Sequence, residues 1–543
     1  MGRFRFSAAA LSVLALLLAA RAAAGDDWRL GCLAEARLAA ARLARLEHMP
    51  ADELWVRQRL AWENARLRAS LRSLALNVAP VRRPGLRLEA YVSANDDSAQ
   101  PFLRYLPPSW SPDRPAPLLV FLHGYDPSMD ELFDPYIPDL CARIADRAGA
   151  VVAAPFGRAN TDYQGIGEQD VLRVVDEMAG RFNIDRQRVV LFGWSMGGLG
   201  AWCLAARHPD RFNGVFVLSG RGDFYLWHGL QPADLPPWQR RLVDVQFATA
   251  WLPNVTNLTV LAAHGMRDNL IGFSQGRGMF ERYTARNAHG IFLGFPEDGH
   301  GVFDSVLLHP RTLPWLGDAL LHAKPKDRPT GLRPGETGSR VQNAFLRPFA
   351  FVGAHATDPQ AASRTVAARA AEWHRFAKAE PRTMIETAID TNVAVACHLF
   401  LFGEPETSEL VRRVLTEGGV RWRTDAFRVA GRTLTRDGHG LWFTGRNPFN
   451  PQRLAIVQCG LPWGANLRED NHRYDRIPDA IAYGPETDRW GNNLADAAGF
   501  LDDQWRVQWF DPPVTDAIRK PPEPAWPEAA TDVEWGPGMG TEK

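Results

Sequence analysis

The alternation of short apolar runs with helical stretches between Leu86 and Pro325 restricts the available folds more than any other feature of the sequence. Such runs, bounded by turn residues, are typical of buried strands, and helices between them favour a parallel sheet. The expected strands are Leu118–Leu122, Ala150–Ala154, Val189–Phe192, Gly214–Ser219, Leu258–Ala263 and Gly290–Phe295. The expected helices include Gly167–Phe182, Gly198–His208 and Gly276–Asn287. We therefore predict an α/β domain over residues 85–325, with a mostly parallel sheet covered by helices.

The preceding segment, residues 25–84, is rich in Ala, Leu and Arg and predicts an N-terminal helical hairpin divided at Pro50. One helical face carries apolar side chains, at Val56, Leu60, Leu67, Leu71 and Leu74. The arginines alternate with acids such as Glu47, Glu53 and Glu63, which indicates a solvated face opposite that stripe. We expect the hairpin to dock on the α/β domain. A helix that binds a partner or a membrane surface is the alternative.

A second, smaller α/β domain is expected over residues 340–519, after a linker rich in Pro and Gly at residues 326–339. Its expected strands are Phe349–Val352, Val393–Phe402 and Arg453–Gln458, and its expected helices are Gln360–Ala379 and Glu406–Leu415. Residues 520–543 are rich in Pro and predict a tail outside the folded domains.

The first 24 residues have the three regions of a secretory signal peptide. Arg3 and Arg5 give a basic start, Ala8–Ala20 is apolar, and small residues precede Gly25. We expect cleavage near Ala24, a secreted or periplasmic protein, and no stable membrane span after cleavage. An uncleaved membrane anchor is disfavoured because Arg21 interrupts a short apolar stretch, and lipid attachment at Cys32 is a further alternative.

Charge and cysteine content argue against a nucleic-acid-binding protein, a zinc protein and a thiol redox protein. Lys plus Arg and Asp plus Glu both number 62, so no net charge favours nucleic acid as a partner. The five scattered cysteines lack the paired spacing of zinc or thiol redox motifs. We expect buried free thiols, with one structural disulfide left open, and neither a metal nor another cofactor.

A Gly-x-Ser-x-Gly motif lies between an expected strand and an expected helix, at Gly193-Trp194-Ser195-Met196-Gly197. A nucleophile on such a sharp turn needs small neighbours because the backbone is crowded there. A serine nucleophile also needs an imidazole base, which in turn needs a carboxylate to orient it. Asp268 and His300 each follow an expected strand, and the order Ser195, Asp268, His300 is that of the α/β-hydrolase fold.

Other histidines and acids are weaker candidates for this triad. We expect His264 to be structural at a strand end, His208 to mark the end of a helix, and His123 to precede the oxyanion turn. Glu297 and Asp298 are expected to be surface acids because they lie too close in sequence to His300. The oxyanion donors should be the backbone N–H groups of Met196 and Tyr125.

These motifs, together with His264-Gly265-x-x-Asp268 and Asp298-Gly299-His300-Gly301, resemble the catalytic domain of prolyl-oligopeptidase-type serine hydrolases. They are also similar to secreted bacterial esterases of the feruloyl esterase and polyhydroxybutyrate depolymerase kind. The resemblance covers roughly residues 85–325 and implies an α/β-hydrolase fold, no metal and an acyl-enzyme on Ser195. The β-propeller of prolyl oligopeptidases has no counterpart in the short helical segment before this domain, so gated peptide selection is in doubt.

Substrate-binding residues are expected on loops at the carboxyl ends of the strands, at 157–165 and 220–227. The second loop offers Arg221, Asp223, Tyr225 and Trp227, although simple loop packing is an equal alternative. We expect a secreted serine hydrolase acting on a small-molecule, peptide or polysaccharide-linked acyl group, with esterase and peptidase hypotheses nearly even. A surface binding protein that retains a vestigial hydrolase fold is the competing hypothesis.

Overall fold

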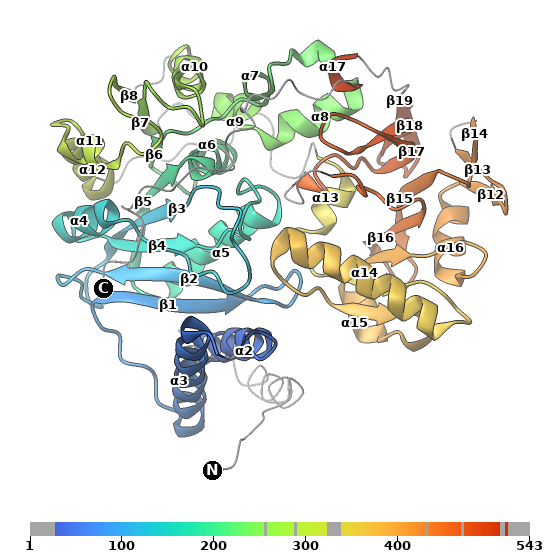
Figure 1. Ribbon diagram of the computed structural model, residues 1–543, viewed down its shortest axis with the longest axis horizontal. Coiled ribbons are helices and arrows are strands. Elements are labelled where there is room, and N and C mark those ends of the chain that lie inside the picture. Colours follow the sequence, from blue (N-terminus) through green and yellow to red (C-terminus); the bar gives the residue numbers. More distant parts are fainter. Residues whose placement is uncertain are drawn as a thin grey trace.

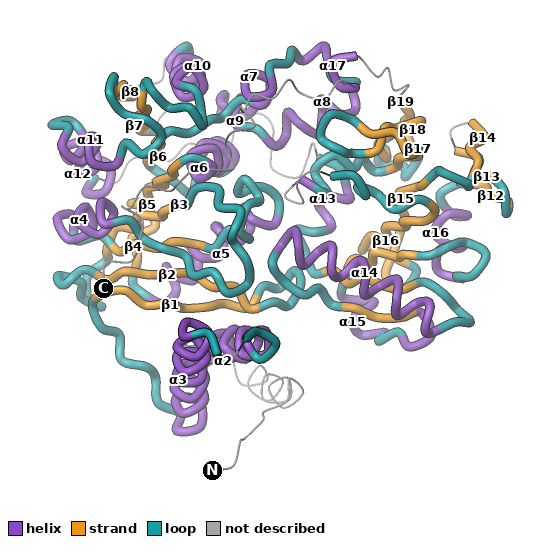
Figure 2. Tube along the Cα trace, in the orientation of Figure 1, coloured by secondary structure: helices purple, strands orange, loops and turns teal. Residues whose placement is uncertain are grey.

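The structure, a computed structural model, describes residues 28–50, 52–254, 258–286, 290–322, 338–429, 432–467, 472–510 and 516–519. Its two large sheets lie in different halves of the molecule, each flanked by helices (Figures 1 and 2). The expected signal peptide, nearly all of the expected linker and the expected Pro-rich tail fall outside the described residues. No helix in the described ranges combines the length and apolar character needed to cross a bilayer.

The first sheet has eight strands in the order β1-β2-β4-β3-β5-β6-β7-β8. They are β1 (Gly85–Val92), β2 (Ala99–Leu106), β3 (Ala116–Leu122), β4 (Val151–Pro155), β5 (Ile184–Trp194), β6 (Gly214–Leu218), β7 (Thr259–Gly265) and β8 (Gly290–Phe295). The pairs β1–β2 and β2–β4 are antiparallel, and all pairs from β4 to β8 are parallel. This confirms the predicted α/β class and adds the hairpin β1–β2, which the apolar pattern did not indicate.

Helices cover both faces of this sheet because successive strand residues point to opposite sides. On β3, Leu118 and Val120 join the core under α5 (Ile166–Arg181), α6 (Met196–Arg207) and α10 (Phe273–Thr284). Leu119 and Phe121 face the core under α4 (Asp139–Ala148), α11 (Phe303–Leu308) and α12 (Thr312–Leu321). Three helices, α7 (Phe224–His228), α8 (Pro237–Gln246) and α9 (Ala248–Trp251), lie between β6 and β7 in sequence.

The second sheet also has eight strands, in the order β10-β9-β11-β16-β15-β17-β18-β19, parallel from β10 to β16 and antiparallel beyond. Its strands are β9 (Phe349–Gly353), β10 (Thr383–Ile385), β11 (His398–Phe402), β15 (Gly440–Asn447), β16 (Asn450–Gly460), β17 (Ala480–Thr487), β18 (Asn493–Leu501) and β19 (Val507–Phe510). A small sheet contains β12 (Arg421–Arg423), β13 (Ala426–Val429) and β14 (Arg432–Thr435). The helices are α13 (Arg340–Ala344), α14 (Pro359–Ala377), α15 (Thr391–Ala396), α16 (Glu409–Glu417) and α17 (Asp516–Arg519).

The single strand predicted over Val393–Phe402 is wrong in its first half. Residues Thr391–Ala396 form helix α15, and strand β11 begins only at His398. The side chain of Asp390 accepts hydrogen bonds from the backbone N–H groups of Asn392 and Val393 and so caps the helix. An apolar run of this length suits either a strand or a helix, and the preceding Asp was the signal that distinguishes them.

The N-terminal hairpin, α2 (Trp28–Leu46) and α3 (Leu54–Leu76), lies beside β1 and β2 (Figure 1). Of the predicted apolar stripe on α3, only Val56 is buried. The other members are half-buried: Leu60, Leu67, Leu71 and Leu74. The acid assigned to the solvated face, Glu63, is instead 0% exposed. It is buried because arginines of both helices surround it, so here charge pairing rather than apolar periodicity decides which face is covered.

The two domains share a core. Trp238 and Leu242 of α8 and Ile166 of α5 belong to the same cluster as Phe345, Phe349 and other aromatic side chains of the second domain. A polar contact also crosses the boundary, from His374 Nε2 on α14 to Glu131 Oε2 in the first domain at 3.4 Å. All five cysteines are buried and free, in agreement with the expected thiols.

The ion pair at His374 predicts a pH-dependent stability. Hydrogen bonds to Glu131 and Glu380 raise the pKa of His374 to about 9, above its unfolded value of about 6.5. The protonated form is therefore favoured by folding, and its contribution is complete below about pH 6.5 and disappears as the pH rises through about 9. We expect the melting temperature to fall across this window in the native protein and to fall less in His374→Gln. Equal slopes for the two proteins in thermal denaturation would contradict the assignment.

Candidate active site

Ser195 lies on a strained turn between β5 and α6. Its φ of 58° and ψ of −119° are unfavourable for a residue with a side chain, as at the nucleophile of an α/β-hydrolase. A Cβ on Gly193 would lie 1.9 Å from the carbonyl oxygen of Gly197, and a Cβ on Gly197 would lie 1.9 Å from that of Leu122. Only glycine fits these two positions, so the turn depends on the motif that predicted it.

Asp268 and His300 meet across two neighbouring loops. His300 Nδ1 lies 2.8 Å from Asp268 Oδ2, although the two residues follow different strands, β7 and β8. The backbone N–H of Met266 donates to Phe295 O at 2.8 Å and that of Arg267 to Asp298 O at 2.9 Å. A Cβ on Gly265 would lie 2.1 Å from Gly299 O, so this glycine permits the close approach of the loops.

Three hydrogen bonds hold the carboxylate of Asp268, and His264, whose Nε2 lies 2.7 Å from Ile271 O, lies beside it. Its Oδ1 accepts from the backbone N–H groups of Leu270 and Ile271, both at 2.9 Å. Its Oδ2 lies 3.1 Å from His264 Nε2 as well as 2.8 Å from His300 Nδ1. Burial raises the pKa of Asp268, but the polar contacts with His264 and His300 outweigh burial and lower that pKa below its usual range. Asp268 is therefore ionised and fixed in place.

Trp194 links His300 to the nucleophile. Its indole Nε1 donates to His300 O at 3.2 Å, and the two rings pack with centroids 5.3 Å apart. Because Trp194 precedes Ser195, these contacts bring the imidazole beside the nucleophilic turn. Ser195 Oγ makes no hydrogen bond within the described part of the chain; in free enzymes such contacts are often long and tighten on substrate binding.

The turn after β3 also lies against the nucleophile. A Cβ on Gly124 would lie 2.9 Å from the Trp194 ring and 3.3 Å from Ser195 Cβ. The next residue, Tyr125, has a side chain that is 42% exposed, while Met196 is the first residue of α6. The structure thus brings the two expected oxyanion donors, Tyr125 and Met196, to the same side of the sheet as Ser195.

The expected substrate-binding residues form contacts of two kinds. Arg221 Nη2 lies 2.8 Å from Asp162 Oδ2, and the guanidinium stacks on Trp227 at 4.5 Å from the ring centroid. These contacts join the loops at 157–165 and 220–227. Asp223 instead caps α7 through the N–H groups of Tyr225 and Leu226 and pairs with Arg282, so its carboxylate is engaged within the protein.

The second domain reaches these same loops, which sequence reasoning did not anticipate. His472 Nε2 lies 3.7 Å from Asp162 Oδ2 while its Nδ1 lies 2.7 Å from Asp475 Oδ2. Trp490 packs against His228, with centroids 5.2 Å apart, and against Phe224. No local signal marks their contacts with the first domain, because the partners in that domain lie more than 200 positions away in the sequence.

No group of three or more His, Cys, Asp or Glu side chains in the described residues is arranged to hold a metal ion. Near Ser195, the structure pairs His300 with Asp268, and Trp194 joins His300 to the turn that carries Ser195.

Comparisons with known proteins find similarity to esterases. A family model described as "Putative esterase" matches residues 97–290. The bifunctional acetylxylan esterase/xylanase XynS20E of Neocallimastix patriciarum is 26% identical over 186 residues, 33% of this chain and 23% of that protein. The chain spans from 23% to 46% of the lengths of the curated relatives that it matches.

Two solved structures illustrate the range of similar folds. An S-formylglutathione hydrolase from Agrobacterium tumefaciens is 17% identical, with a TM-score of 0.34, covering 44% of this chain and 98% of that one. The acylaminoacyl peptidase of Pyrococcus horikoshii is 15% identical, with a TM-score of 0.33, covering 43% of this chain and 40% of that one. The family match and the observed sheet order together show an α/β domain that is similar to esterases over residues 97–290.

Proposed function

We propose that this protein is a serine esterase in which Ser195, His300 and Asp268 act as nucleophile, general base and orienting acid. The observation that supports this most directly is the 2.8 Å contact between His300 and the ionised Asp268, which lies beside the strained turn of Ser195. The esterase family match over residues 97–290 favours an ester over an amide bond.

The proposed reaction has two acyl-transfer steps. Ser195 Oγ attacks the ester carbonyl carbon while His300 Nε2 accepts the hydroxyl proton, and Asp268 stabilises the resulting imidazolium. The backbone N–H groups of Met196 and Tyr125 stabilise the tetrahedral oxyanion. His300 then donates the proton to the departing alcohol, and water, activated by the same imidazole, releases the acid from Ser195.

The loops at 157–165 and 220–227 support a proposed substrate class. Arg221 and Trp227 offer a cation stacked on an aromatic ring, a combination suited to an acyl or alcohol group that is planar or carries oxygen acceptors. The proposed location outside the cytoplasm depends on the sequence of residues 1–24. A polysaccharide-linked or small-molecule ester is the proposed substrate.

The decisive experiment compares a short-chain nitrophenyl ester with a dipeptidyl anilide, using the protein that begins at Gly25. We expect turnover of the ester that depends on Ser195 and little cleavage of the anilide. Because peptidases also hydrolyse activated esters, comparable Ser195-dependent cleavage of the anilide would identify a peptidase instead. Failure to process either substrate, with Ser195→Ala as the blank, would support the binding-protein hypothesis.

A further inference from the structure

The segment that carries Tyr125 has no regular secondary structure to hold it. Residues 123–138, here called the oxyanion loop, connect β3 to α4 without a helix or strand. The backbone N–H of Asp126 donates to Asn160 Oδ1 at 3.1 Å, and Asn160 Nδ2 donates back to Asp126 O at 2.8 Å. Two local turns shape the middle of the loop, with the N–H of Met129 donating to Asp126 O and that of Phe133 donating to Asp130 O, both at 3.2 Å. Side chains of other elements then hold these turns in place.

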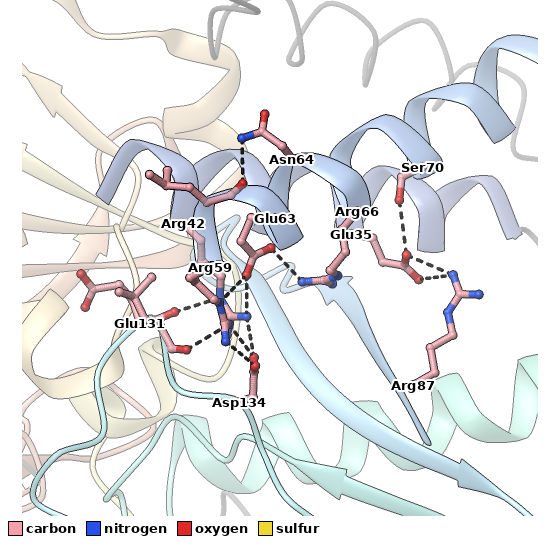
Figure 3. A network of polar contacts seen from close by, with 12 residues as sticks. Glu35, Arg42, Arg59, Glu63, Asn64, Arg66, Ser70, Arg87, Glu131 and Asp134 are labelled. Atoms are coloured by element: carbon pink, nitrogen blue, oxygen red, sulfur yellow. Dashed lines mark hydrogen bonds and ion pairs between the residues drawn. The ribbon is translucent and has the colours of Figure 1, made fainter. Parts of the chain in front are cut away.

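Two arginines of the N-terminal hairpin bind the middle of this loop (Figure 3). Arg42, on α2, donates to Glu131 O at 3.1 Å and to Phe133 O at 2.7 Å, and pairs with Asp134 at 2.6 Å. Arg59, on α3, donates to Leu132 O at 3.1 Å and pairs with the other oxygen of Asp134 at 2.6 Å. Together they engage every residue from 131 to 134.

The arginines are themselves fixed by a buried carboxylate. Glu63 lies 3.2 Å from Arg42, 3.1 Å from Arg59 and 3.0 Å from Arg66, and its side chain is 0% exposed. Arg42 is 1% exposed. Buried charges are tolerated when each has its partners, and removing one partner leaves the other uncompensated. The network therefore has one well-defined arrangement, and the loop is part of it.

The second domain binds the same segment from another direction. Glu131 pairs with Arg45 of the hairpin at 2.7 Å and with His374 of α14 at 3.4 Å. The hairpin and α14 both lie outside residues 97–290, the part that matches the esterase family. The N-terminal hairpin and the second domain therefore both contact the oxyanion loop, although neither belongs to the part of the chain that matches the esterase family.

Aromatic side chains connect the segment bound by the arginines, residues 131–134, to the turn at residues 123–125. Phe133, next to Asp134, packs on the ring of His123 with centroids 6.0 Å apart. Tyr136 packs on His123 at 6.4 Å and on Phe121 at 5.5 Å, and its hydroxyl group is hydrogen-bonded with the backbone of Gly124. A shift of residues 131–136 would therefore move the turn that presents the Tyr125 N–H.

We propose that Arg42 and Arg59 are positioning residues for catalysis, which hold residues 131–134 so that the Tyr125 N–H stays aimed at the developing oxyanion. This inference rests on the proposed serine hydrolase function. It assigns to the hairpin a role in transition-state stabilisation, beyond covering β1 and β2.

Arg59→Met in the full chain tests this inference. Arg59 is 21% exposed, whereas Arg42 is almost fully buried, so we replace Arg59. In Arg59→Met, Arg42 stays in place and still neutralises Glu63 and Asp134. Asp134→Asn removes the negative charge with which both arginines pair, with almost no change of shape, and serves as the second variant. Arg68→Met, an exposed arginine on the same helix with no ion pair in the described chain, is the matched control.

We expect kcat for the nitrophenyl ester to fall about 10- to 100-fold in Arg59→Met and Asp134→Asn, with KM changed by less than about threefold. Affinity for a phenylboronic acid, which forms a tetrahedral anion on a serine Oγ, should fall in parallel with kcat. The double variant should lose less than the product of the two single losses, because the two variants share the Arg59–Asp134 ion pair. Arg68→Met should match the native protein.

Unchanged kcat and boronic acid affinity alongside a lowered melting temperature would overturn the proposal and leave the network a purely structural role. The rate of Ser195 labelling by a fluorophosphonate separates this outcome from failure of the proposed function. If the native protein is labelled but does not cleave the ester, the esterase proposal fails while the variants' labelling rates still test positioning. If the native protein is not labelled, both proposals fail.

Discussion

Replacing Ser195 with alanine is expected to lower kcat for the nitrophenyl ester by about 10⁴- to 10⁶-fold, because the members of a triad act as a unit and no other group replaces the hydroxyl. KM should change little, since the alanine side chain leaves the glycine-lined turn and the packing of Trp194 on His300 intact. The measurement is steady-state turnover at saturating ester, together with fluorophosphonate labelling, which should be lost completely.

Ser274→Ala is the matched control for this change. Ser274 is an exposed serine on α10 and has no contact with Asp268 or His300 in the described structure. The activity and fluorophosphonate labelling of Ser274→Ala should equal those of the native protein. Activity of Ser195→Ala within about tenfold of the native value would show that the nucleophile lies elsewhere.

Replacing Asp268 with asparagine is expected to lower kcat by about 10³- to 10⁴-fold without unfolding the domain. The amide keeps the shape of the carboxylate but cannot stabilise the imidazolium, and it favours the wrong tautomer of His300. His264 makes this change informative, because its Nε2 also lies 3.1 Å from Asp268 Oδ2 and would remain in place. The measurement is the pH dependence of kcat/KM beside the melting temperature.

Glu297→Gln provides the control for Asp268→Asn. Glu297 is close in sequence to His300, but its side chain is 77% exposed and pairs with Arg267 on the surface. We expect native activity from it. A larger loss from Glu297→Gln than from Asp268→Asn would assign the orienting acid to Glu297.

Local sequence patterns predicted the part of the fold that surrounds the nucleophile. Apolar runs predicted each parallel strand from β3 to β8. The glycines around Ser195 predicted a sharp turn, and the structure leaves no room for a Cβ at Gly193 or Gly197. The positions of Asp268 and His300 after two strands also predicted their contact, because the loops that follow neighbouring parallel strands lie at the same edge of a sheet. Each of these features depends on residues close together in the chain.

Other features escaped prediction because their residues carry polar or ambiguous patterns. Strands β1 and β2 contain buried charged residues, such as the pair Glu89 and Arg104 at 2.7 Å, which break the apolar signal of a buried strand. The residues of helix α15 also fit the pattern of a buried strand, because six residues do not establish a period. The burial of Glu63 was missed because its partner Arg42 lies on another helix.

Local patterns in the chain predict the α/β class, the strained serine turn and the order of the expected acid and base, because strand periodicity and steric limits at glycine act over a few residues. Three contacts depend instead on how distant elements pack: His264 lies beside the carboxylate of Asp268, Arg42 and Arg59 bind the oxyanion loop, and His472 lies 3.7 Å from Asp162. These contacts join side chains from elements whose relative positions follow from packing of the whole molecule. Charge pairing has no period, so the partners of a buried ion become known only when the fold brings them together.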